Sequence, residues 1–573
     1  MFVVMGIGAD DIFVLHDKFE QAAQQMPGGS ISDIASLAIP QASYAMLLTS
    51  VTTAGAFFST SVTPVAPIRM FAIFLGTMTV FDYIFVIIIC APAKVLQEYW
   101  VEAITRKGPH FGRLLKLSLL DYSKVSTRSS KGTHEKKDTL CQSVLVRAGR
   151  MTISFRYILV PGLLALFAYF TMVALDIPMP KTSEIQLLDD SHVFTKWSKW
   201  KNDVYYKDGG ETSWVRVIWG LRPGDTGSAN DPSSRPSLLL DSTFDLPNPE
   251  VQTWTLKFCD DLKQQSFVTG RADCMMDSFN SFLKSQHDPI TNQNYKGMPI
   301  PAHVFKPLFL QWRQQTRHRT KTIGVASEIE NTTLNGEDDI VFLVMNFEAT
   351  VKWNDPYNKL KSQYYEWSDY IDKEMKAAPS GIKNGFFISD DFHWWDTNRQ
   401  MKNSAYQSAL ISVGVATGVL LISNANVFLT LYSVVSIFCI LVTVAATAVV
   451  MGWELGFLEA ICFAILVGLS CDFIVHIAHA YQMSKSATRR QKSLDAIWEM
   501  GPPVLFAAVS TTLSGALLFS CNILFYIKFG VILMLTMAYS FIMIFVFLVP
   551  LLALAGPMGN WGDLTYCCRS KRK

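Results

Sequence analysis

Two short stretches place acidic side chains inside apolar runs. Near the start, "GIGADDIFVL" carries Asp10 and Asp11, and near the end, "VGLSCDFIVHIAHAY" carries Asp472. An ionised carboxylate at the centre of a membrane helix costs about 2.5 to 3.5 kcal/mol, so such residues usually face a protein interior and serve an ion or proton pathway. These three acids therefore predict a cation-coupling site.

Two histidines share a helix face with the third acid. His476 and His479 follow Asp472 by four and seven residues, which places all three within about 60° of one helix face. We assign His476 to the coupling site, where it is either a proton relay or a hydrogen-bonded packing residue. His479 lies nearer the helix end and is expected to be interfacial. Two histidines without a third ligand nearby make a poor zinc site, so no metal site is predicted.

The two acidic stretches are repeats of one another. A shift of 462 residues aligns "VMGIGADDIFV" with "LVGLSCDFIVH", pairing Gly6 with Gly468 and the first acid with the last. The same shift pairs Pro40 with Pro502, and a shift of 460 aligns "TTAGA" with "TLSGA". Each acidic helix is expected to precede a linker and a helix that starts at the proline. We predict two parallel repeats with the site between them, and a helix-packing role for the two glycines.

The elements that carry these motifs are membrane helices. Half of the 573 residues are hydrophobic, 17% are charged, and the mean hydropathy is +0.22. Eight apolar runs approach or exceed the ~20 residues that a helix needs to cross a bilayer. These runs lie at 40–63, 68–92, 157–177, 405–423, 427–451, 456–480, 503–526 and 529–555, with a shorter run at 1–15.

Basic residues give the orientation and the domain plan. Lysine and arginine gather before residue 157, in "KSATRRQK" and in the terminal "RSKRK", which places these segments in the cytoplasm. The plan is the C-terminal part of a first transmembrane repeat (1–93), a basic cytoplasmic loop (94–156), one transmembrane helix (157–177), an extracytoplasmic domain (178–404), five further transmembrane helices (405–556) and a basic cytoplasmic tail (557–573).

The extracytoplasmic domain has an α+β pattern. "SWVRVIWGL" and "DDIVFLVMNFEATV" have the apolar spacing of strands, whereas "TWTLKFCDDLKQQ" and "YYEWSDYIDKEMKAA" are typical of helices with a charged face. Cys259 and Cys274 can form a disulfide in this compartment, and Asn331 heads a glycosylation sequon that predicts a glycoprotein. The predicted fold class is a polytopic α-helical membrane protein with an α+β extracytoplasmic domain.

Other polar residues within the apolar runs are less informative. Asp82 either joins the coupling site or pairs locally with Tyr83 or Thr79. Thr49, Thr52 and Thr53 are expected to bond carbonyls of their own helix.

Together these motifs resemble a known superfamily. "GIGADD" followed by a helical linker, "GLSCDF" with a histidine four residues after its aspartate, and a large outer domain between helices are similar to the resistance-nodulation-division (RND) transporters, which include Patched. Within that superfamily the sequence most resembles the Dispatched family, through "FFSTSVTPVAPIRMFAIFLGT" and "LAGPMGNWGDL" as well.

The resemblance implies a place for each segment. The family has twelve membrane helices, with a sterol-sensing domain over the second to the sixth. Residues 1–93 would then hold the end of helix 4 with helices 5 and 6, residues 157–177 helix 7, and residues 405–556 helices 8 to 12. It also implies that the chain is an N-terminally truncated fragment.

The function that the resemblance implies is cation-driven export or release of a lipidated or sterol-like cargo. Several carboxylates suit a hard cation such as Na⁺, and carboxylates beside a histidine suit H⁺; the sequence leaves both ions open. The expected partners are the cargo and membrane lipids, with no cofactor beyond the coupling ion. The alternative is a sterol-sensing membrane protein that binds lipid without transporting it.

Composition and motifs also argue against other classes. No nucleophile and base pair or phosphate loop points to an enzyme, and no basic stripe with interleaved aromatic residues points to nucleic acid. We expect an integral multi-pass protein of the plasma membrane or an endomembrane.

Overall fold

The computed structural model describes most of the chain, which forms two compact units. The membrane unit comprises Met1–Pro178, Gln186–Asp189 and Gln400–Lys573, and the α+β unit comprises Met179–Ile185 and Asp190–Arg399. The described residues are 2–107, 140–181, 187–201, 204, 212–224, 227–228, 231, 233–234, 239–287, 293–315, 323–325, 339–352, 355–559 and 561–564.

Within these described residues, eight helices are long and apolar enough to cross a membrane. The sequence predicted eight spans, and each helix overlaps one of the predicted runs, so the chain is a multi-pass membrane protein. The helices are Ile31–Thr60, Ala66–Ala103, Arg156–Leu175, Phe392–Asn424, Val427–Val450, Leu458–Met483, Arg489–Ser520 and Leu524–Ala555.

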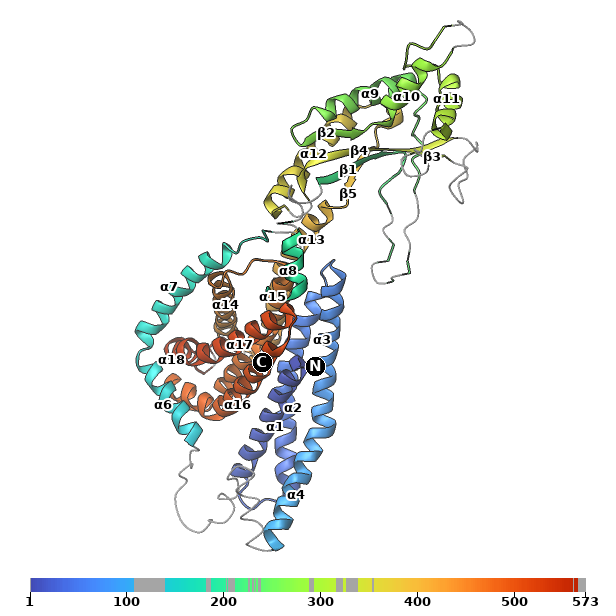
Figure 1. Ribbon diagram of the computed structural model, residues 1–573. Helices are drawn as coiled ribbons and strands as arrows, with labels where there is room; N and C mark the ends of the chain where they lie inside the picture. The colour runs from blue at the N-terminus through green and yellow to red at the C-terminus, as the bar shows by residue number, and fades with distance from the viewer. Residues whose placement is uncertain are drawn as a thin grey trace, which may run out of the picture. The chain divides into compact units, whose positions relative to one another are not determined.

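The helices of the membrane unit form two groups that are distant in the sequence (Figure 1). The first group is α1 (Phe2–Gln25), α2 (Ile31–Thr60), α3 (Ala66–Phe85), a π-helical turn (Val86–Cys90) and α4 (Ala91–Lys107). The second group is α6 (Leu140–Ser154), α7 (Arg156–Leu175), α13 (Phe392–Asn424), α14 (Val427–Val450), α15 (Phe457–Met483), α16 (Arg489–Leu517), α17 (Leu524–Met543), a π-helical turn (Ile544–Leu548) and α18 (Val549–Ala555).

The repeat is visible in how the helices pack. The two helices that carry the acidic motifs are α1 and α15, and the helices that follow them are α2 and α16. Helix α1 packs against α2 and also against α16, and α15 packs against α16 and also against α2. Each acidic helix therefore contacts the following helix of both repeats, as two parallel repeats around a shared interface require.

The expected starts of two helices are wrong. Pro40 and Pro502 do not begin helices but lie inside α2 and α16, which start at Ile31 and Arg489. Local capping explains the earlier starts, because the side chains of Ser30 and Thr488 accept backbone N–H groups in the first turns. A proline inside a membrane helix is tolerated where neighbouring helices satisfy the freed backbone groups.

The α+β unit contains an antiparallel sheet. In the described part of this unit the strand order is β2-β4-β1-β5, with β3 also paired to β4. The central pair sets Val217 of β1 opposite Met345 of β4. The strands are β1 (Thr212–Trp219), β2 (Val268–Asp273), β3 (Ile323–Val325), β4 (Ile340–Lys352) and β5 (Phe386–Ser389).

Helices cover one face of this sheet (Figure 1). Val215 and Val217 of β1 share a core with Phe258 of α9 and Trp367 of α12. The predicted α+β class of this domain is confirmed, and the two strands and two helices expected from the sequence are β1, β4, α9 and α12. Its helices are α8 (Val193–Trp200), α9 (Pro249–Lys263), α10 (Met275–Ser285), α11 (Ala302–Gln315) and α12 (Tyr357–Ala377).

Candidate functional site

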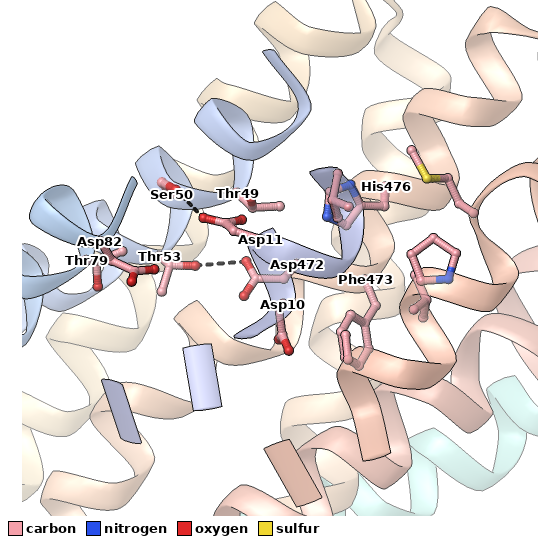
Figure 2. Close-up of a pocket in the computed structure, with 15 residues that line it drawn as sticks. Asp10, Asp11, Thr49, Ser50, Thr53, Thr79, Asp82, Asp472, Phe473 and His476 are labelled. Atoms are coloured by element: carbon pink, nitrogen blue, oxygen red, sulfur yellow. Dashed lines mark hydrogen bonds between the residues drawn. The ribbon is translucent and has the colours of Figure 1, made fainter. Parts of the chain in front are cut away.

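Four carboxylates line one cavity in the membrane unit. Asp10 and Asp11 reach it from α1, Asp472 from α15 and Asp82 from α3, and Figure 2 shows them around a common space. The cavity has a volume of about 30 Å³, which accommodates one or two water-sized groups. Pockets for drug-sized ligands have volumes of about 300 Å³ or more. The cavity is therefore on the scale of an ion and not of a lipid.

Two of the acids accept hydrogen bonds across the repeat interface. Thr53 on α2 donates its hydroxyl to Asp472 at 2.8 Å (Figure 2), and Thr511 on α16 donates to Asp10 at 3.1 Å. Each donor belongs to the repeat that does not contain its acceptor. Because a hydroxyl is a neutral donor, these bonds orient the carboxylates without compensating their charge.

Two serines lie beside the acids of the first repeat. The Ser50 hydroxyl lies 3.5 Å from Asp11, and the Ser510 hydroxyl lies 3.5 Å from Asp10. The shift of 460 residues makes these serines equivalent positions in the two repeats. Both distances are long for O–H···O hydrogen bonds. Ser50 lines the cavity, so its oxygen atom can turn toward another ligand, whereas Ser510 is not among the cavity-lining residues and donates to the Ala507 carbonyl at 3.0 Å.

Gly468 brings α15 close to α2. A Cβ at this position would lie 3.0 Å from the Cβ of Ala56 and 3.5 Å from the carbonyl oxygen of Thr53. The close approach places Asp472, one turn along α15, within reach of the Thr53 hydroxyl. Its repeat equivalent Gly6 lies in α1, but its surroundings fall outside the described residues, so its packing role stays a prediction.

The structure shows no basic partner for the acids among the residues that it describes. In the described part of the chain, no lysine or arginine forms an ion pair with any of the four; the buried lysine of α1, Lys18, pairs instead with Glu499 at 2.7 Å. Asp10, Asp11 and Asp472 line the same small cavity, so a negative charge on one of them acts on the others. Like charges at short range in a low dielectric repel strongly, so the cluster favours the binding of a positive charge.

His476 lines the same cavity and is 8% exposed. It follows Asp472 by one helical turn, as the spacing predicted. His479 is not among the cavity-lining residues, and its ring lies 5.7 Å from that of Tyr44. The structure thus brings together Asp10, Asp11, Asp472 and His476, and their role in coupling stays a prediction.

Two further residues belong to the cavity: Asp82, for which the sequence left a place in the site open, and Thr53, which the sequence assigned to its own helix. Asp82 packs directly on α1, since a Cβ at Gly8 would lie 2.5 Å from its carboxylate oxygen. Thr49 and Thr52 bond carbonyls of their own helix as expected, but Thr53 bonds Asp472 instead. An acid inside an apolar run was a usable signal for Asp82. Nothing in the local sequence separates Thr53 from its neighbours.

The remaining predicted site residues lie in the α+β unit. Cys259 and Cys274 form a disulfide. With Asp277 they are the one group of three potential metal ligands gathered within the described residues, but disulfide sulfurs are not thiolate ligands. Asn331 falls outside the described residues, so its glycosylation stays a prediction.

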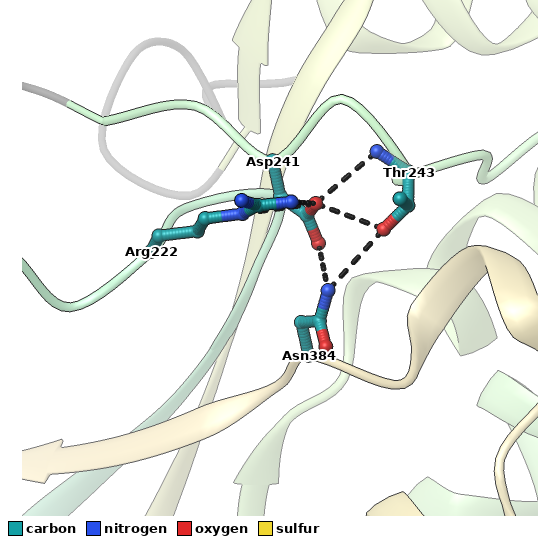
Figure 3. Close-up of polar contacts among 4 residues, drawn as sticks. All are labelled: Arg222, Asp241, Thr243 and Asn384. Atoms are coloured by element: carbon teal, nitrogen blue, oxygen red, sulfur yellow. Dashed lines mark hydrogen bonds and ion pairs between the residues drawn. The ribbon is translucent and has the colours of Figure 1, made fainter.

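A buried carboxylate in the α+β unit shows a different arrangement (Figure 3). Asp241 accepts hydrogen bonds from Arg222 at 2.9 Å, from the Thr243 hydroxyl at 2.8 Å and from the Asn384 amide at 2.8 Å. Burial raises the pKa of Asp241, but the hydrogen bonds from Asn384, Arg222 and Thr243 outweigh it and lower this pKa to about 2. At neutral pH this carboxylate is a charged anchor between the segment that follows β1 and the turn before β5.

Comparison with known proteins supports the membrane fold. The "Patched SSD" family model matches residues 1–96. The cryo-EM structure of the hedgehog release protein Disp from the water bear Hypsibius dujardini aligns over 97% of this chain and 63% of that one, with a TM-score of 0.68 and 22% identity. This similarity confirms the RND-type fold.

Similar sequences extend over nearly the whole chain. Mouse protein dispatched homolog 1 is 28% identical over 99% of this chain and 38% of its own length. Drosophila melanogaster protein dispatched is 23% identical over 100% of this chain and 51% of its own length. The chain therefore spans between about two fifths and one half of these relatives.

Proposed function

We propose that this chain is a Dispatched-like member of the Patched and RND superfamily. We propose further that it forms part of a transporter in which a Na⁺ or H⁺ gradient drives the release of a lipidated or sterol-like cargo. The coupling ion would bind among Asp10, Asp11 and Asp472, with His476 and Asp82 at the edges of the same cavity. The observation that carries the proposal is the cluster of carboxylates around one cavity at the repeat interface, for which the described residues supply no lysine or arginine partner.

The chemistry of the cavity suits a small cation. Carboxylate and hydroxyl oxygens are the ligands that hard cations prefer, and the cavity offers both kinds from α1, α2, α3 and α15. The donor set crosses the repeat interface, since Thr53 and Thr511 bond acids of the opposite repeat. Binding or loss of a cation would therefore change contacts between the two repeats, which is what coupling to a conformational change requires.

His476 keeps the proton a candidate for the coupling ion. His476 is the only imidazole on the cavity wall among the described residues, and a histidine beside carboxylates can pass a proton. The hydroxyl oxygens of Ser50 and Thr53 on the cavity wall favour Na⁺, since hydroxyl oxygens can ligate a metal cation directly.

The cargo class comes from the relatives. The water bear protein is named a hedgehog release protein, and a cargo of that kind is too large for a cavity of about 30 Å³. Ion and cargo would therefore follow separate paths, and movement of the two repeats would couple ion binding in the cavity to release of the cargo.

A sterol-binding role without transport is the second candidate. The observation in its favour is the "Patched SSD" match over residues 1–96, which includes α2 and α3. In that role the hydrophobic α2 and α3 surfaces would be required and the acids would be dispensable.

The test is release of a cholesterol-modified reporter protein from cells that express the chain. We expect release to fall when external Na⁺ is replaced by choline if Na⁺ is the ion, or to follow the external pH at constant Na⁺ if H⁺ is the ion. Asp10→Asn and Asp472→Asn should each abolish the dependence.

Undiminished release by both variants would overturn the coupling proposal. If, in addition, photoactivatable cholesterol labelled α2 and α3, the sterol-binding role would replace it.

A further inference from the structure

The short helix α8 presents an uncovered apolar face. Val193, Trp197 and Trp200 are 77%, 59% and 60% exposed, and no residue of α8 is buried. Their spacing of four and then three residues places them on one side of the helix. Val204, which is 64% exposed, continues the spacing beyond the helix end. Aromatic side chains of this size are rarely left in water as a contiguous group.

Lysines flank this face. Lys196 precedes Trp200 by four residues, and Lys201 follows Trp197 by four, with its amine 5.4 Å from the centre of the Trp197 indole. Lys199 lies on the opposite side and pairs with Asp190 at 2.8 Å. An aromatic face bordered by lysines is the pattern of helices that lie in the membrane interface.

The chain holds the start of α8 near the end of a membrane helix. Leu188 forms a β-bridge with Ile523, and the N–H of Leu524 donates to the carbonyl of Leu187 at 2.9 Å. Leu524 is the first residue of α17, a candidate membrane span. Val193 follows Leu188 by five residues, which reach at most about 18 Å. Helix α8 therefore begins within that distance of the membrane boundary.

The residues at the other end of the tether are also exposed and apolar. Leu187 and Ile523 are 54% and 42% exposed, so hydrophobic side chains are exposed at the point where the short tether to α8 begins. The headgroup region of a bilayer is about 5 to 8 Å thick on each side, a depth that a helix on this tether can reach.

We propose that α8 is an interfacial helix whose Val193, Trp197 and Trp200 face inserts into the lipid leaflet on the side of the α+β unit. The indoles would occupy the headgroup level, where tryptophan is enriched. Lys196 and Lys201 would extend along the surface to lipid phosphates. The helix thereby anchors the beginning of the α+β unit to the bilayer, independently of any cation binding in the cavity.

The experiment uses the whole chain in phosphatidylcholine vesicles that contain a phosphatidylcholine with a photoactivatable group near the glycerol end of one acyl chain. After illumination, mass spectrometry maps lipid adducts on peptic peptides. We expect adducts on residues 193–201. In the double variant Trp197→Glu, Trp200→Glu, the yield of these adducts should fall at least about tenfold, which corresponds to a change of about 1.4 kcal/mol in the free energy of insertion.

Two control variants separate contact from misfolding. Trp197→Leu with Trp200→Leu keeps the face apolar and should retain the adducts. Trp214→Glu replaces a tryptophan of β1 that is 46% exposed and should leave the α8 adducts unchanged. Absence of adducts on α8 in the unaltered chain would mean that protein covers the face and would overturn the proposal. Equal labelling of the glutamate variant would overturn it as well.

Discussion

Asp241 in the α+β unit and Asp472 in the membrane unit are both shielded carboxylates, but their partners differ in kind. Asp241 accepts bonds from a guanidinium, an amide and a hydroxyl, whereas Asp472 is bonded to one threonine hydroxyl and a weak thiol donor and faces other acids. A carboxylate whose charge is compensated stabilises the fold. A carboxylate whose charge is left uncompensated costs stability, and its retention calls for a ligand that is bound only part of the time.

The largest expected difference concerns ion binding. Asp472→Asn removes a carboxylate ligand from the cavity. If Na⁺ is the coupling ion, the purified chain should then bind radioactive Na⁺ at least about tenfold more weakly, which corresponds to about 1.4 kcal/mol of binding free energy. The same variant should unfold at an unchanged or higher temperature without Na⁺, because an uncompensated charge is removed from the membrane interior. Thermal unfolding in choline chloride measures this unfolding temperature. A marked loss of stability in the variant would show that Asp472 is a structural acid like Asp241.

Asp241→Asn should lower the folding stability and leave cation binding unchanged, which is the opposite of Asp472→Asn. Loss of charge-assisted hydrogen bonds should destabilise the α+β unit by about 2 kcal/mol, while the membrane unit keeps its cation binding. Hydrogen exchange of residues 212–224 and 239–245 measures the first effect in the whole chain. Unchanged protection of these segments would show that Asp241 is not the anchor described above.

Gly468→Ala tests whether close packing positions Asp472. The added methyl would lie 3.0 Å from the Cβ of Ala56, and such overpacking costs about 1 to 3 kcal/mol. We expect a severalfold weaker cation affinity, since α15 must move away from Thr53. The matched control is Gly414→Ala in α13, where nothing lies within 4 Å of the new methyl; its affinity should equal that of the unaltered chain.

The smallest effect is a pH dependence of the α+β unit. The pKa of Asp241 is lowered from 3.8 to about 2 in the folded state, so its contribution is complete above about pH 4 and disappears as the pH falls toward 2. The stability difference between the unaltered chain and Asp241→Asn should shrink over that window. A difference that stays constant from pH 5 to pH 2 would contradict the assignment.

Much of the membrane unit could be predicted from the sequence, whereas contacts between its helices could not. Long apolar runs and the repeat predicted the membrane helices and brought Asp10, Asp11, Asp472 and His476 to one place, because helix length and spacing are local properties. The cross-repeat bond of Thr53 was not predictable, since it depends on how closely α15 approaches α2. The starts of α2 and α16 were wrong because capping residues, and not the prolines, set them.

Cation flux across vesicles that contain the chain tests the central claim most directly. Indicators of Na⁺ and of pH inside the vesicles are followed after an outward or inward gradient is imposed, for the unaltered chain, Asp472→Asn and Asp241→Asn. We predict that the unaltered chain and Asp241→Asn carry one of the two ions at similar rates and that Asp472→Asn carries neither. Equal flux through Asp472→Asn and the unaltered chain would contradict a coupling site at these acids.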